Sequence, residues 1–160
     1  MLYTTNNKLP TRFHSLPVYL AGGSAGCPDW QSKLLGLIDQ DGFDVVNPRR
    51  SKGLAKNSME DRLQLEWEHR ALQHANIVLF WFPKESECAT AMFEYGKILE
   101  RADTLGLRII AGYDPEYAHA AYLELQTQLA VDWAENDDLA VDLVSGWEKF
   151  KELVFEEVGK

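Results

Sequence analysis

One glutamate, Glu94, stands where a parallel α/β sheet would expose it to a ligand. Residues 76–82 are apolar, rich in aromatic and branched side chains and closed by Pro83, which is typical of a strand buried on both faces. Helical periodicity begins at Thr90, which would place Glu94 in the first turn of the next helix. Free N–H groups at a helix N-terminus keep a carboxylate ionised. An ionised carboxylate near the carboxyl end of a central strand is a candidate nucleophile.

Short apolar runs alternate with helical segments on both sides of this strand. Further strands are predicted at residues 17–21, 43–46, 107–112 and 139–144, and helices at 30–38, 58–74, 90–103, 116–130 and 147–154. Such alternation indicates βαβ units with parallel strands. The sequence therefore predicts an α/β fold, a small doubly wound parallel sheet of about five strands with helices on both faces. Residues 1–16 are polar, and we expect a poorly ordered arm there, followed by a single domain at 17–160.

Two predicted loops carry residues suited to holding a substrate. The candidates are Gly22, Gly23 and Ser24 after the first strand, and Asn47, Arg49 and Arg50 after the second. Arginine forks bind phosphate well, so the substrate could be a nucleoside 5′-monophosphate or a nucleotide sugar. A salt-bridged loop is the alternative. The glycine turn lacks a full GxGxxG pattern, which argues against dinucleotide binding. For these glycines the alternative to substrate contact is a turn that only connects the strand to the helix.

Two more candidates flank the polar loop before Glu94. Trp81, near the end of the central strand, could stack a base, and core packing is the alternative. Thr90 opens the following helix beside Glu94 and is a further candidate for substrate contact.

The composition limits the classes of function. The chain has 160 residues and a net charge of −9, which argues against a general binder of nucleic acid polymers or membrane surfaces. No segment reads as a signal peptide or approaches transmembrane length. The two cysteines, Cys27 and Cys88, form no metal-ligand spacing, and a reducing cytoplasm is the simplest expectation.

Four segments together resemble the nucleoside 2-deoxyribosyltransferase-like family. They are VYLAGGS in the first strand and turn, NPRR after the second strand, LEWEHRAL on the helix before the central strand, and TAMFEYG after it. The resemblance implies a flavodoxin-like enzyme that breaks the N-glycosidic bond of a nucleoside or nucleotide and passes the sugar to a free nucleobase. It also implies double displacement without metal or redox cofactor, and a homo-oligomer whose pocket a neighbouring subunit completes.

The resemblance assigns three catalytic roles. Glu94 matches the glutamate nucleophile, which forms a glycosyl-enzyme intermediate. Tyr19 matches the tyrosine that positions this glutamate. Glu68 matches an acidic residue that contacts the base and assists its protonation. Some transferases carry another acidic residue six positions before the nucleophile, where this chain has Cys88.

The chemistry of glycosidic cleavage agrees with these roles. One group must capture positive character at the anomeric carbon and another must protonate the leaving base. Two carboxylates in different environments can divide that work, with the pKa of Glu68 raised by desolvation. Two alternatives to transfer remain. One is an N-glycosidase that uses water, which the lack of an acidic residue at Cys88 and the presence of Arg49 and Arg50 favour. The other is a nucleotide sensor without catalysis.

Overall fold

The computed structural model describes residues 1–50, 59–134 and 139–159. In chain order the elements are β1 (Leu2–Thr4), β2 (Leu16–Gly22), α1 (Trp30–Leu35), β3 (Phe43–Asn47), α2 (Met59–His74), β4 (Ile77–Phe82), α3 (Ala89–Leu105), β5 (Arg108–Tyr113), α4 (Ala120–Asp132), β6 (Val141–Ser145) and α5 (Trp147–Val158). Strands and helices alternate as predicted, because each apolar run becomes a strand and each periodic segment a helix. No helix in the described part of the chain is long and apolar enough to cross a membrane.

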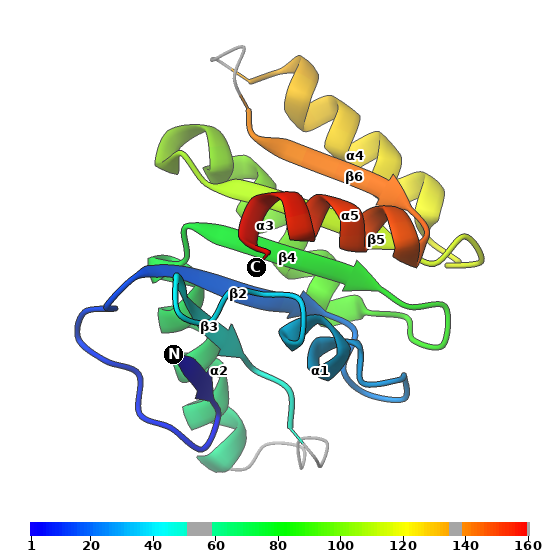
Figure 1. Ribbon diagram of the computed structural model, residues 1–160. Helices are drawn as coiled ribbons and strands as arrows, with labels where there is room; N and C mark the ends of the chain where they lie inside the picture. The colour runs from blue at the N-terminus through cyan, green and yellow to red at the C-terminus, as the bar shows by residue number, and fades with distance from the viewer. Residues whose placement is uncertain (51–58, 135–138, 160) are drawn as a thin grey trace.

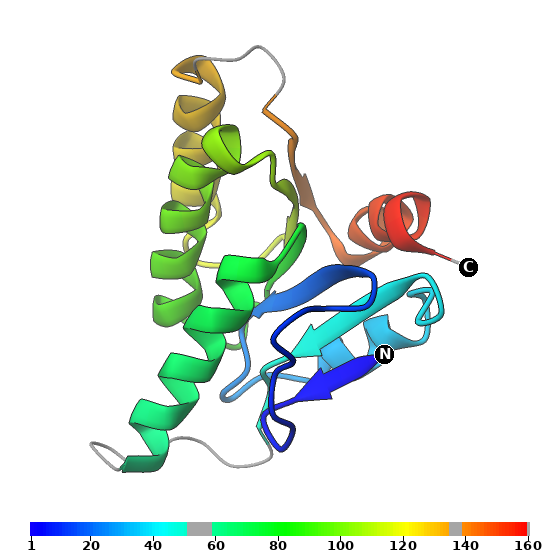
Figure 2. The ribbon, with the colours of Figure 1, turned by 90° about the vertical axis from the view of Figure 1, so that its left-hand side faces the viewer.

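The described strands form one parallel sheet between two layers of helices. The strand order is β1-β3-β2-β4-β5-β6, and every strand pair is parallel. Helices α2, α3 and α4 cover one face, and α1 and α5 cover the other (Figures 1 and 2). Without β1, the order is that of a flavodoxin-like sheet, which confirms the predicted fold class.

Among the described residues the sheet has six strands, one more than the predicted number of about five, because Leu2–Thr4 also joins it. Leu2–Thr4 pairs with Val45–Asn47 at the edge of the sheet. Tyr3 is buried and packs edge-on against Phe13, with ring centroids 5.4 Å apart. The segment is thus held by contacts distant in sequence, which a local pattern does not reveal.

The sheet changes its winding direction between β2 and β4. The chain leaves β2 through α1 on one face and leaves β4 through α3 on the other. Gly22 ends β2 with φ +130°, and a Cβ there would lie 2.2 Å from the Trp81 carbonyl oxygen. Only glycine allows this approach, and the Gly23 N–H then donates to the same oxygen at 3.0 Å. The two strands therefore stay close at the edge where open α/β sheets bind ligands.

Candidate active site

A cavity of about 280 Å³ lies between α2 and α3. It is lined by Leu65, Glu68, His69 and Leu72 from α2, and by Thr90, Phe93, Glu94, Lys97, Ile98 and Arg101 from α3. Its volume is near the lower end of the range for small-molecule pockets. Glu68 and Glu94, 26 residues apart in the sequence, therefore face one small-molecule-sized space, as the proposed chemistry requires.

Helical spacing explains how the two helices present these side chains. Residues three or four apart lie on one side of a helix, and Thr90, Glu94, Lys97 and Arg101 follow that spacing along α3. The neighbouring stripe of α3, including Tyr95 and Ile98, packs onto the sheet. Burial of this apolar stripe fixes the rotation of α3 and aims Glu94 into the cavity.

The structure differs from the prediction for Glu94 in two ways, namely the helical turn in which it lies and the pKa of its side chain. Helix α3 begins at Ala89 and has no acidic residue in its first turn, so Glu94 is in the second turn. Burial, and secondly the negative charge of Glu68, raise the pKa of Glu94 to about 7, against an opposing effect of Lys97. The helix terminus therefore does not hold the pKa of Glu94 low as predicted, because burial outweighs the dipole one turn further along the helix.

Glu68 is held by a hydrogen-bonded chain that the sequence analysis missed. Burial raises the pKa of Glu68, as predicted, while a hydrogen bond from Gln64 and the charge of Arg50 oppose the rise. The Gln64 amide donates to Glu68 Oε1. Its oxygen accepts from Arg50 Nε at 2.8 Å. Gln64 is buried and lies four residues before Glu68, and this helical spacing was the available signal.

Tyr19 lies in the sheet beneath the two helices. It is 1% exposed and belongs to the same buried cluster as Leu72 and Tyr95. Burial, followed by the charges of Glu94 and Glu68, raises the pKa of Tyr19 well above its usual value. The phenol is thus neutral and lies near enough for the charges of both carboxyl groups to act on it, on the sheet face that α2 and α3 cover, although Tyr19 does not line the cavity itself.

The glycine turn lies beside the start of α3 and does not line the cavity. The Gly23 carbonyl accepts a hydrogen bond from Trp30 Nε1 at 2.7 Å. A Cβ on Gly23 would lie 2.9 Å from Cys88 Sγ, which precedes α3. Ser24 is exposed. The turn serves close packing of loop and helix, and a ligand contact through Ser24 stays a prediction.

Arg49 has a structural role that involves both loops. Its guanidinium donates to Cys27 O at 2.8 Å and Gln31 Oε1 at 2.9 Å. Its backbone N–H donates to Asn47 Oδ1 at 3.0 Å. Arg49 and Arg50 line a separate groove of about 1010 Å³ between the N-terminal segment and α2. Arg49 Nε also lies 3.6 Å from Asp29 Oδ1, so the salt-bridged alternative describes Arg49, and Asn47 shapes the same loop.

Trp81 and Thr90 fall on different sides of the sheet. Trp81 faces α1 and α5, where its ring centroid lies 5.0 Å from that of Trp147 and 5.3 Å from that of Phe150. The structure therefore does not bring it to Glu94, and core packing explains it. Thr90 is exposed and lines the cavity one helical turn before Glu94.

A comparison with protein families matches residues 15–108 to the family described as nucleoside 2-deoxyribosyltransferase like. The match covers more than half of the chain and includes Tyr19, Glu68 and Glu94. The chain belongs to this family. A search among curated proteins finds no match.

Within this nucleoside 2-deoxyribosyltransferase-like chain, Cys88 departs from the acidic pattern of some transferases. Cys88 is buried at the N-cap of α3 with φ +51°. Burial raises the pKa of its thiol to about 11, so the side chain is neutral at physiological pH. It cannot supply the negative charge of the acidic residue that some transferases have at this position.

The raised pKa of Glu94 predicts a pH-dependent gain in stability for Glu94→Gln. The pKa is 4.5 ordinarily and about 7 in the folded protein. Between these values the folded state keeps a proton that the unfolded state loses, so wild-type stability falls as pH rises through this window. Urea unfolding should show Glu94→Gln more stable by roughly 2 kcal/mol at pH 8, with the gain vanishing near pH 4.5.

Glu100→Gln is the matched control for this measurement, because Glu100 is exposed on the same helix. It should give no gain that grows with pH. Equal gains for both variants at pH 8 would show that Glu94 is not held in a poorly hydrated site.

Proposed function

We propose that this protein cleaves the N-glycosidic bond of a (deoxy)nucleoside through a covalent glycosyl-Glu94 intermediate and transfers the sugar to another base. The observation that carries this proposal is the shared cavity of Glu68 and Glu94, in which one carboxyl group has a pKa of about 7. Groups with strongly shifted pKa values in a pocket are candidates for catalysis. Membership of the family supports the substrate class.

The coupling of the two carboxyl groups suits the first chemical step. Burial, and secondly the charge of Glu68, raise the pKa of Glu94, and burial also raises the pKa of Glu68, so both carboxyl groups hold a proton more strongly than ordinary glutamates. In the productive form, Glu94 is ionised and attacks the anomeric carbon while Glu68 holds the proton. The C1′–N bond breaks, its electron pair passes to the base nitrogen, and Glu68 donates its proton to the departing base.

The surrounding polar groups support this division of roles. Gln64 orients Glu68 through its hydrogen bond, and Arg50 fixes Gln64 in turn. The buried Tyr19 phenol stays protonated, so it is available to donate a hydrogen bond to ionised Glu94. In the second step, a nitrogen of the incoming base attacks the anomeric carbon, the bond between this carbon and Glu94 breaks, and Glu68 takes the proton of the attacking nitrogen.

The second candidate function is hydrolysis by a nucleoside or nucleoside 5′-monophosphate N-glycosidase. The neutral thiol of Cys88 favours it, since an acidic residue that some transferases use is lacking. In that case water attacks the glycosyl-Glu94 intermediate in place of a second base. A sensor that binds a nucleotide without turnover is the remaining candidate.

Incubation with deoxyinosine, with and without free adenine, distinguishes these functions by chromatography of the products. Transfer yields deoxyadenosine only when adenine is present, hydrolysis yields free sugar and hypoxanthine without it, and a sensor yields neither. Glu94→Gln should lower turnover by about 100-fold or more, because the nucleophile is lost. Glu100→Gln should retain full activity. Turnover by Glu94→Gln above a few per cent of wild type would contradict the nucleophile role.

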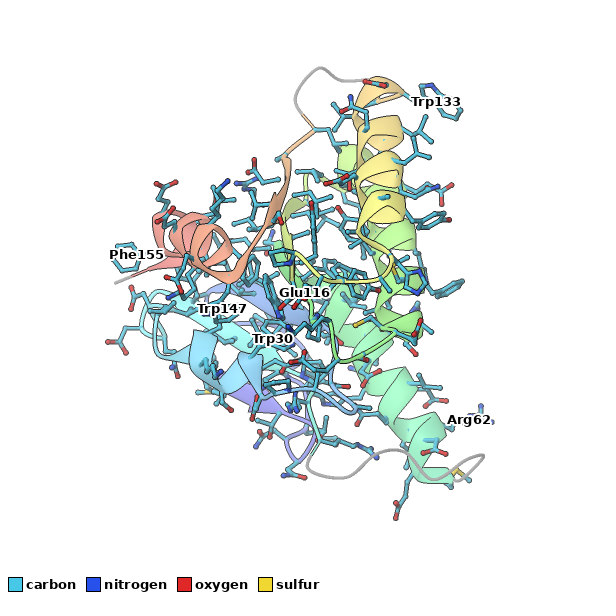
Figure 3. All side chains as sticks on the ribbon, turned by 90° about the vertical axis from the view of Figure 1, so that its right-hand side faces the viewer. Trp30, Arg62, Glu116, Trp133, Trp147 and Phe155 are labelled. Carbon is cyan, nitrogen blue, oxygen red and sulfur yellow. The ribbon has the colours of Figure 1, made fainter. Side chains whose placement is uncertain are left out.

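We also propose that a second copy of the chain covers the α2–α4 layer and closes the cavity. Most of the exposed large apolar side chains are on this layer: Met59, Leu63, Leu65, Phe93, Leu105, Tyr122, Leu125, Val131 and the adjoining Trp133. Trp133 projects from α4 on the side opposite to Phe155 on α5 (Figure 3). Exposed apolar side chains gathered on one layer often mark a protein–protein contact surface. Leu65 and Phe93 line the cavity itself, so a partner here would exclude water from Glu68 and Glu94.

Phe93→Asp should shift the protein from oligomer to monomer in light scattering after size-exclusion chromatography. The charge would be placed in the proposed interface, where it has no partner. Phe155→Asp is the matched control, because Phe155 is 52% exposed on the opposite layer, and its mass should equal that of wild type. A wild-type protein that is monomeric at micromolar concentration, or equal masses for both variants, would contradict the interface.

A further inference from the structure

The cavity that holds the two carboxyl groups also has a cationic side. His69 on α2 and Lys97 and Arg101 on α3 line it together with Glu68 and Glu94. Lys97 and Arg101 continue the stripe of Glu94 toward the C-terminal end of α3. From the helical rise, Lys97 lies about 4.5 Å and Arg101 about 10 Å along the axis from Glu94. The acidic and basic side chains of α3 are thus separated along the helix axis at one cavity.

The two cations on α3 are available for a ligand. Arg108 pairs with Asp142 and Glu157, and Arg62 pairs with Glu66. The Arg49 guanidinium donates a hydrogen bond to the carbonyl of Cys27 in the loop between β2 and α1. By contrast, across residues 1–50, 59–134 and 139–159 no hydrogen bond or ion pair engages the side chain of Lys97 or Arg101. Lys97 acts on Glu94 only through its charge.

We propose that Lys97 and Arg101 form an anion-binding subsite, and that the substrate is a nucleoside 5′-monophosphate. This inference rests on the proposed glycosidic chemistry at Glu94. A phosphate on the 5′ carbon is one sugar ring away from the anomeric carbon, so it extends along α3 while the anomeric carbon faces Glu94. The guanidinium of Arg101 offers the fork that binds phosphate oxygens, and the Lys97 ammonium adds a point charge.

The subsite differs from the phosphate site that the sequence suggested at Arg49 and Arg50. Arg49 supports the loops, and Arg50 fixes Gln64 in the groove on the other side of α2. Neither arginine lines the cavity of Glu94. Phosphate recognition is thus assigned to the helix that carries the nucleophile, which couples phosphate binding to the position of the reacting carboxylate.

The test is the ratio of kcat/KM for deoxyinosine 5′-monophosphate to that for deoxyinosine, with the 3′-monophosphate as a third substrate. Wild type should prefer the 5′-monophosphate by at least tenfold, and Arg101→Gln should lower that ratio by at least tenfold. Arg101 is chosen because Lys97 also affects the pKa of Glu94. Arg62→Gln is the matched control, since Arg62 is exposed on α2 and points away from the sheet (Figure 3).

A ratio that is near one, that favours the 3′-monophosphate or that is unchanged in Arg101→Gln overturns the subsite while leaving glycosidic cleavage intact. Absence of turnover on every substrate overturns the proposed function instead.

In that case the subsite is tested by binding. Ribose 5-phosphate should raise the unfolding temperature of wild type and of Arg62→Gln but not that of Arg101→Gln. Equal protection of all three proteins, or of none, would overturn it. Light scattering on Arg101→Gln should give the wild-type mass, and a changed mass would assign Arg101 to subunit contact.

Discussion

Two carboxyl groups held in one poorly hydrated cavity repel each other, and the rest of the site depends on this unfavourable pair. The sheet keeps them together, because α2 and α3 each bury an apolar stripe on it. Leu72 and Tyr95 pack with Tyr19 in one buried cluster. Moving the helices apart would relieve the repulsion but would expose this apolar surface, which costs about 25 cal/mol for each Å². The fold thus maintains a pKa of about 7 at Glu94.

The neighbouring groups adjust this pair without neutralising it. Gln64 and Arg50 favour the charged form of Glu68, Lys97 favours the charged form of Glu94, and the Tyr19 phenol remains protonated. None of these groups forms a close ion pair with Glu94 among the described residues. A carboxylate that is not neutralised by a close partner remains able to attack an anomeric carbon, which is the property the proposed reaction requires.

The sequence predicted the parallel sheet, but it did not predict the surroundings of the candidate site residues. Apolar runs such as Ile77–Phe82 identify strands by composition alone. A fully apolar strand does not show which side chains face which helices, so the sequence left both base stacking and core packing open for Trp81. β1 was missed because Leu2–Thr4 is stabilised by pairing with β3 and not by local pattern. The pKa of Glu94 depends on burial and on Glu68, both set by helix packing that spacing in the chain does not reveal.

The most direct test of the shared cavity is a pH titration of the side-chain carboxyl carbons by NMR. The account predicts that Glu94 titrates with an apparent pKa near 7 and that this value falls in Glu68→Gln, which removes the neighbouring negative charge. Titration of Glu94 near its ordinary pKa of 4.5, unchanged in Glu68→Gln, would show that the two carboxyl groups do not share a poorly hydrated site.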